Sequence, residues 1–261
     1  MGILARRQQT LTVAALAYAL ALVPPVLNAE PAATLPSAQV VTDRFAQALG
    51  GVPAIGKHES ITTTLRYEIP GKHVVLQEIT YAKPFKALTV FKFPDGRASF
   101  TGYDGKDAWA IDKDGQVHHA KPEVLPSVRR DADILYFTHI LDYFRSLQTE
   151  DVETFDGRPC YRLLGVNNWG IQNEQFYDVK TGLLAGYRFD PSWRGGPKGA
   201  TIQTFSDYKD FDGSKFATRI VTTDPDGTQI ETVTDVSYAP IDDSVFFLAH
   251  FTAGKPAAAT H

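Results

Sequence analysis

The segment ITTTLRYEIPGKHVVLQEITY, residues 61–81, contains two candidate β-strands separated by a Pro-Gly turn. In its first half, residues of a more apolar side alternate strictly with residues of a more polar side. Leu65 and Tyr67 belong to the more apolar side. A period of two residues is typical of a strand with one buried face. Pro70-Gly71 turns the chain, and residues 73–81 run back beside the first strand. We therefore predict an antiparallel hairpin in this segment.

Asp-Gly pairs separate further segments that are rich in β-forming residues. They occur at Asp95-Gly96, Asp104-Gly105, Asp114-Gly115, Asp156-Gly157, Asp212-Gly213 and Asp226-Gly227. Because Asp-Gly tolerates the positive φ angles of tight hairpin turns, its repetition indicates an antiparallel meander. The pattern predicts about eleven strands, most of them joined as hairpins, and a fold that is mainly β with a few helices.

Two segments with helical periodicity interrupt the strands. The first, SAQVVTDRFAQALGG (37–51), offers Ser37 as N-cap, an apolar stripe, and Gly50-Gly51 as a stop. The second, DADILYFTHILDYFRSL (131–147), is predicted to form a strongly apolar helix. Its stripe contains Phe137, Leu141 and Phe144. This helix is expected to pack across the inner side of a curved sheet, to line an apolar cavity, or to do both.

The two ends of the chain differ from the segment between them. Residues 1–29 have the pattern of a removable secretory signal, with a basic start, a short apolar run and a small residue, Ala29, near the cleavage point. No cysteine lies there to carry a lipid. We expect an exported, periplasmic chain with one domain at 37–250 and a flexible Ala/Pro-rich tail at 251–261.

The composition of the chain argues against one class of partner and excludes one source of stability. The formal net charge is −4 and no basic block occurs, which argues against nucleic acid as a partner. Cys160 is the one cysteine, so no intramolecular disulfide can form and packing must stabilise the chain. It opens a candidate strand and is interpreted as a small buried apolar residue. The expected state is a monomer.

Catalytic and metal-binding patterns give no candidate with the required spacing. G-x-S-x-G, H-E-x-x-H and C-x-x-C are all missing from the sequence. His139 and Asp142 stand one helical turn apart, but such pairs are common on helix surfaces. The acidic pairs are Asp131/Asp133, Asp210/Asp212 and Asp242/Asp243, at places where Asp normally caps or turns. We therefore predict a non-enzyme with no catalytic residue, no metal and no cofactor.

The order of several motifs resembles a known family of exported bacterial proteins. ALGG (48–51) ends the first helix, and Lys83-Pro84 and GYDGKDAW (102–109) follow in the meander. After the apolar segment come FDGRPCYRL (155–163), FYDVKTGLLAGY (176–187), FSDYKDFDGSKFATRI (205–220) and APIDDSVF (239–246). Over residues 37–248 this order resembles the outer-membrane lipoprotein-sorting type, which is related in fold to the periplasmic carriers LolA and LolB.

The resemblance implies a highly curved antiparallel sheet, an unclosed barrel, with helices over its open mouth. The carriers of this family hold the acyl chains of lipoproteins in an apolar cavity between sheet and helices. Phe216-Ala217 stands where many exported relatives have a proline, and the Asp-Gly turns and the chain length depart from the true carriers. The resemblance therefore extends to the fold and not to the cargo.

The first functional hypothesis is a periplasmic binding or carrier protein for an acyl chain or another apolar ligand, such as a lipid or lipoprotein, with an envelope protein as a further partner. The expected pocket residues are Leu65, Tyr67, Phe91 and Phe93 from the sheet, Trp109, and Phe137, Leu141 and Phe144 from the second helix. Trp109 is interpreted first as a structural residue packed under the Asp104-Gly105 turn. The alternatives are a non-catalytic structural or partner-binding domain with a filled core, and a hydrolase whose catalytic groups converge from separate strands.

Overall fold

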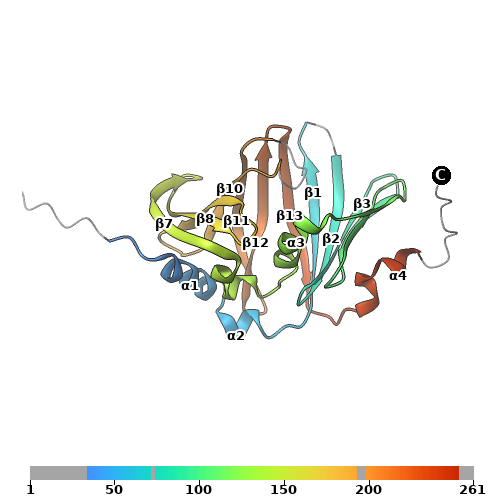
Figure 1. Cartoon of the computed structure of the whole chain (residues 1–261), viewed down its shortest axis with the longest axis horizontal. Helices are drawn as coiled ribbons and strands as arrows, with labels where there is room; N and C mark the ends of the chain where they lie inside the picture. Colours follow the sequence, from blue (N-terminus) through green and yellow to red (C-terminus); the bar gives the residue numbers. More distant parts are fainter. Residues whose placement is uncertain (1–33, 72–73, 193–197, 253–261) are drawn as a thin grey trace, which may run out of the picture. The chain divides into compact units, whose positions relative to one another are not determined.

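A single antiparallel sheet dominates the computed structural model, which describes residues 34–71, 74–192 and 198–252 (Figure 1). Within these ranges it has 13 strands in the order β6-β5-β4-β3-β2-β1-β13-β12-β11-β10-β9-β8-β7. The first six are β1 (Ile61–Ile69), β2 (Val74–Lys83), β3 (Lys86–Lys92), β4 (Ala98–Tyr103), β5 (Ala108–Ile111) and β6 (Val117–His119). The others are β7 (Phe144–Phe155), β8 (Arg158–Asn167), β9 (Gln172–Asp178), β10 (Leu184–Phe189), β11 (Thr201–Phe211), β12 (Ser214–Asp224) and β13 (Gly227–Ser237).

The strand order follows the sequence except at one junction, where β1 pairs with β13. This junction places β6 and β7 at opposite edges, so the sheet stays open and does not close into a barrel. The segment between them, residues 120–143, must therefore connect one edge of the sheet to the other. It contains η1 (Pro122–Val124), α3 (Leu125–Asp131), η2 (Tyr136–Thr138) and η3 (Ile140–Tyr143).

The predicted meander and its turns are confirmed. At both Asp156-Gly157 and Asp212-Gly213 the two residues have positive φ angles, as a tight hairpin turn requires. Ile61–Ile69 pairs with Val74–Lys83 along its whole length. The predicted count of strands is too low, because β6 and β7 were not expected.

The first predicted helix is confirmed as α1 (Ala38–Ala48). The Ser37 hydroxyl accepts a hydrogen bond from the Val40 amide at 3.3 Å, which satisfies one of the free amides at the helix start. Beyond Gly50 and Gly51, which both have positive φ, a short helix α2 (Val52–Ile55) follows. Val40 itself is exposed, whereas Val41 and Phe45 face the core.

The predicted helix over residues 131–147 is wrong. The helix α3 lies earlier and ends at Asp131, short 3₁₀ turns follow, and residues from Phe144 onward form β7. The buried carboxylate of Asp133 accepts hydrogen bonds from donors within the next ten residues, which bends the chain out of a helical path. The backbone of β7 is then hydrogen-bonded along β8, beginning with the pair Phe144 and Asn167.

Different elements pack on the two faces of the sheet. Leu65, Tyr67 and Phe91 share what we call the inner face, since Leu65 pairs with Glu78, which in turn pairs with Phe91. Alternation sends the neighbouring residues to the outer face. There the C-terminal elements η5 (Asp243–Phe246) and α4 (Leu248–Thr252) pack on β3–β5.

Trp109 anchors the outer-face packing. It is 3% exposed, lies over Gly102, and donates from Nε1 to the Phe246 carbonyl at 3.1 Å. Its ring also contacts Phe251 of α4 at a centroid distance of 5.3 Å. Phe251 and Thr252, the first two residues of the predicted tail, belong to α4.

The predicted signal segment and residues 253–261 of the predicted tail lie outside the described residues. The described residues from Leu35 onward belong to one compact unit. Among the described residues, no helix combines the length and the hydropathy needed to cross a membrane.

Replacing Trp109 tests the structural interpretation of this residue. Trp109→Ala removes a buried ring and a buried hydrogen bond, so we expect a loss of about 3–5 kcal/mol in the free energy of unfolding, measured by urea denaturation. The exposed Val152→Ala serves as control and should change stability by less than about 0.5 kcal/mol. Unchanged stability of Trp109→Ala would show that the ring is not part of the core.

Candidate functional site

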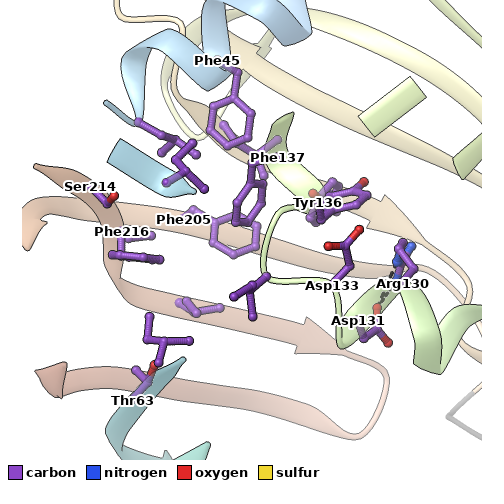
Figure 2. A pocket seen from close by; sticks show the side chains of 18 of the residues that line it. Phe45, Thr63, Arg130, Asp131, Asp133, Tyr136, Phe137, Phe205, Ser214 and Phe216 are labelled. Atoms are coloured by element: carbon purple, nitrogen blue, oxygen red, sulfur yellow. Dashed lines mark hydrogen bonds and ion pairs between the residues drawn. The ribbon is translucent and has the colours of Figure 1, made fainter. Parts of the chain in front are cut away.

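A cavity of about 640 Å³ lies between the inner face of the sheet and the elements that cover it. Its lining is mainly apolar and aromatic, and it comes from α1, α2, the segment 130–137, β1 and β8–β12. The central lining residues are Phe45, Leu49, Ile55, Ile61, Ile134, Tyr136, Phe137, Tyr187, Phe205, Tyr208, Phe216 and Ile220. Figure 2 shows Phe45, Phe137 and Phe205 one below another in the middle of this space.

The first helix supplies one wall of the cavity. Phe45 of α1 packs edge-on against Phe137 at a centroid distance of 5.5 Å and lies beside Leu49 in the lining. The helix is held at the sheet by Arg44, which donates to the Lys180 carbonyl at 2.9 Å. Its C-terminal end is fixed by the Lys215 amide, which donates to the Leu49 carbonyl at 2.8 Å.

A local distortion of β11 widens the wall that the sheet contributes. Asp207 has a φ of 55°, and its carbonyl accepts a hydrogen bond from the Thr218 hydroxyl at 2.6 Å. Phe205 and Tyr208, which stand on either side of it, both line the cavity although strict alternation would separate them. The left-handed residue thus turns an additional aromatic side chain toward the cavity.

Asp133 organises the segment that closes the cavity from the other side. Its side chain is almost fully buried, and it accepts hydrogen bonds from the Leu135 amide at 3.0 Å, the Tyr143 hydroxyl at 2.5 Å and His139 Nε2 at 2.7 Å. The other ring nitrogen of His139 lies 3.0 Å from the Thr138 hydroxyl. Burial, and then the bond to Asp133, raise the pKa of Tyr143. These contacts hold residues 133–143 in the turns that direct Phe137 toward Phe45.

One end of the cavity carries Arg130. Its Nε donates to the Asp131 carboxylate at 2.9 Å, and its guanidinium lies 5.8 Å from the ring centre of Tyr136 and 5.3 Å from that of Trp169. Burial raises the pKa of Tyr136 well above its ordinary value, with the neighbouring Tyr187 as the next cause. The cation at this end is therefore balanced by a carboxylate and enclosed by aromatic rings.

The other end of the cavity lies beside α2 and the hairpin of β11 and β12. His58 stacks on Tyr238 at a centroid distance of 3.5 Å, and its Nε2 is 3.1 Å from the Asp212 carboxylate. Lys57 binds the same carboxylate at 2.9 Å. Ser214 lines the cavity here and is 3% exposed, yet its hydroxyl has no hydrogen-bond partner among the described residues. Figure 2 shows Ser214 and Phe216 on the side away from Arg130 and Asp131.

The residues predicted for the pocket are not all brought together. Phe137 lines the cavity, whereas Leu141 and Phe144 pack in the adjoining core with Leu163 and Tyr177. This separation follows from the loss of the predicted helix, since the three residues no longer share one helical stripe.

The predicted sheet residues lie beyond the lining of the cavity. Leu65, Tyr67 and Phe91 are on the inner face as expected, with the rings of Tyr67 and Phe91 5.7 Å apart, and Phe93 follows β3 in a turn. Trp109 is on the outer face, because its strand pairing with Gly102 puts it on the side of Leu88.

Two carboxyl groups occupy the inner face beside the cavity. Glu231 pairs across the ladder with both Tyr67 and the cavity-lining residue Ile220, and Glu78 pairs with Leu65. Burial raises the pKa of Glu231 to about 7, and the charge of Glu78 adds to the shift. Burial also raises the pKa of Glu78, against the effect of a hydrogen bond from Thr80. A charge on Glu231 is thus unfavourable in the fold at neutral pH.

Cys160 is fully buried as predicted, and burial raises the pKa of its thiol to about 11, so it is a protonated core residue. Among the described residues, no three His, Cys, Asp or Glu side chains are grouped so that they could hold a metal ion. Most lining residues escaped the sequence analysis because they come from many separate elements. Phe45 and Leu49 both lie on the apolar stripe of the first predicted helix, and that pattern could have indicated them.

Comparison with solved structures identifies the fold. A DUF1329 family protein from Desulfovibrio piger matches with a TM-score of 0.58 and 14% identity, over 81% of this chain and 97% of that chain. The LolA superfamily protein NE2245 from Nitrosomonas europaea gives a TM-score of 0.56 and 14% identity, over 82% and 98%. A domain assigned to outer membrane lipoprotein sorting from Vibrio parahaemolyticus gives 0.54 and 13%, over 78% and 97%. The open sheet with few helices is therefore a LolA-like fold, as the resemblance implied.

No family model and no curated protein matches the sequence.

Removing the Asp133 carboxylate tests its role in shaping the cavity. Asp133→Ala leaves the Tyr143 hydroxyl and the His139 ring without their buried acceptor, so we expect a loss of about 2–3 kcal/mol in unfolding free energy. Asp142→Ala, which removes an exposed carboxylate from the same segment, is the matched control and should be near neutral. Equal stability of the two variants in urea denaturation would contradict the role given to Asp133.

Glu231 predicts a dependence of stability on pH. Its pKa is raised in the fold, so its favourable contribution is complete below the ordinary pKa of 4.5 and is lost as the pH rises through about 7. Glu231→Gln should therefore stabilise the protein by about 2 kcal/mol at about pH 8.5 and change it little at about pH 4.5. The exposed Glu150→Gln is the control. An effect of Glu231→Gln that is the same at both pH values would contradict the buried charge as its cause.

Proposed function

We propose that this protein is a periplasmic binding or carrier protein that holds an acyl chain or another apolar ligand of a lipid or lipoprotein. The observation that carries the proposal is the apolar cavity between the inner face of the sheet, α1 and the segment organised by Asp133. The LolA-like fold supports it, since one of the similar structures is a domain assigned to outer membrane lipoprotein sorting. The N-terminal pattern of a secretory signal supports the location.

The energetics of burial suit such a ligand. Each methylene removed from water contributes about 0.8 kcal/mol, so a long chain can be bound without a polar recognition motif. The cavity volume of about 640 Å³ lies within the range of roughly 300–1,000 Å³ that ligand pockets usually have. The central aromatic residues Phe45, Phe137 and Phe205 offer flat apolar surfaces on which a chain can lie.

The proposed activity is non-enzymatic. The titratable groups best placed at the cavity already have structural neighbours. Asp133 is bonded to three donors, Arg130 is bonded to Asp131, and His58 Nε2 lies 3.1 Å from the Asp212 carboxylate. The rival account is a partner-binding or structural domain whose cavity holds no ligand. A hydrolase that uses the same groups is the less supported alternative.

Filling the cavity separates the carrier from its rivals. Ala217 lines the cavity on β12, and Ala217→Trp should place a ring where a chain would lie and weaken the binding of a fluorescent fatty acid by at least about tenfold. Ser146→Trp adds the same ring to an exposed position on β7 and should bind as the wild type does.

Urea denaturation of both variants shows whether Ala217→Trp remains folded. Binding lost while stability is retained supports the carrier. No binding by the wild type at any concentration at which the probe stays monomeric would leave the partner-binding domain as the better account.

A further inference from the structure

The two ends of the cavity differ in charge and in hydrogen-bonding capacity. All the carboxylates of its lining belong to one end, where Asp131 and Asp133 accompany Arg130. At the other end the lining contains His58, Ser214 and Lys215 and no acidic residue. The middle between them is apolar. A ligand that is polar at one end only would therefore meet two distinct environments.

Ser214 is a buried donor without an acceptor. The residue is 3% exposed, and its hydroxyl has no hydrogen-bond partner among the described residues. Buried hydroxyl groups in folded proteins are almost always hydrogen-bonded. Ser214 lines the cavity, so an acceptor atom of a ligand bound at this end would complete its hydrogen bonding.

Lys215, the next residue in the chain, is the lysine that lines the cavity at this end. Its amide is fixed by the Leu49 carbonyl at 2.8 Å, and its side chain is exposed and makes no ion pair among the described residues. The nearby Asp212 is already bound by Lys57 and His58. Asp210, which pairs with Lys215 across the hairpin, accepts the Gly213 amide at 2.9 Å.

The Arg130 end is less suited to an anion. Its guanidinium is bonded to Asp131, and Asp133 lines the same end. Asn173 of the lining lies at the start of β9, close in sequence to Trp169, which contacts Arg130. Its unpartnered buried atom is the side-chain oxygen, which is an acceptor. An anionic oxygen placed there would face two carboxylates and a further acceptor.

We propose that the ligand is an amphiphile with an anionic oxygen head, a carboxylate or a phosphate, and that the head binds at Ser214 and Lys215 while the chain extends through the aromatic middle toward Arg130. This inference rests on the proposed function and adds the chemical class and the orientation of the ligand. The Ser214 hydroxyl donates to the anionic oxygen, and the Lys215 ammonium neutralises it. The chain then follows Phe216, Phe205 and Phe137.

The test compares four probes that share a sixteen-carbon chain: palmitate, hexadecyl phosphate, methyl palmitate and hexadecylamine. Each displaces a fluorescent fatty acid from the full-length protein, and the apparent Kd is measured. We expect the two anions to bind more tightly than the ester and the amine. Palmitate and hexadecyl phosphate distinguish a free fatty acid head from a lipid phosphate, and whichever binds more tightly identifies the head.

Variants then locate the head group. Ser214→Ala and Lys215→Gln should each weaken the binding of the preferred anion by about tenfold and leave methyl palmitate unchanged. Thr201→Val is the matched control for Ser214, because Thr201 is also buried with an unpartnered hydroxyl but does not line the cavity. Lys209→Gln is the control for Lys215, being exposed on the same hairpin and outside the lining.

Equal binding of all four probes, unaffected by Ser214→Ala and Lys215→Gln, would overturn the assigned head group and leave the carrier function standing. Loss of the anion preference in Arg130→Gln but not in Lys215→Gln would overturn the orientation. No binding of any probe, the ester included, would remove the carrier function and this inference with it.

Discussion

The cavity depends on one buried carboxylate. Asp133 lies in an interior where an ionised group must be fully hydrogen-bonded, and it meets this need by gathering the Leu135 amide, His139 and the Tyr143 hydroxyl around itself. Those donors are spread over the nine residues 135–143, so the chain has to fold back in tight turns. The turns place Phe137 over the sheet and start β7 at the far edge. A regular helix in the same place would give neither.

Local chemistry was enough to predict eleven of the 13 strands in the described residues, together with their turns. Alternation along residues 61–69, the Asp-Gly turns and the Ser37 cap each act within a few residues, and the structure contains all of them. The predicted helix over residues 131–147 does not form, because apolar residues at helical spacing are equally compatible with a chain that turns between two cores. Its last residues find their backbone partners on β8, and a sequence pattern cannot show that distant pairing.

The cavity itself was much less predictable than the fold. Its walls come from elements scattered between Phe45 and Tyr238, and most of their side chains look like ordinary core residues in the sequence. The expected face of Leu65, Tyr67 and Phe91 does exist, but the cavity lies farther along the sheet. The left-handed backbone at Asp207 reverses the alternation of β11, which a period-two pattern cannot anticipate. Ser214 carries no sequence signal at all, because its significance comes only from the partner that it lacks.

An open sheet has edge strands through which two copies of the protein could pair. β7 is the twelve-residue strand at one edge of the sheet in the described part of the chain, and edge strands can pair with another chain and lead to aggregation. Two register shifts, one near Arg145 and the other near Glu150, interrupt the regular pairing of β7, and both residues are charged and exposed. An incoming strand pairs most easily with an edge that is flat and uncharged. The edge formed by β7 is irregular and charged, which disfavours such pairing. An open fold can thus keep its cavity accessible without becoming a template for fibres.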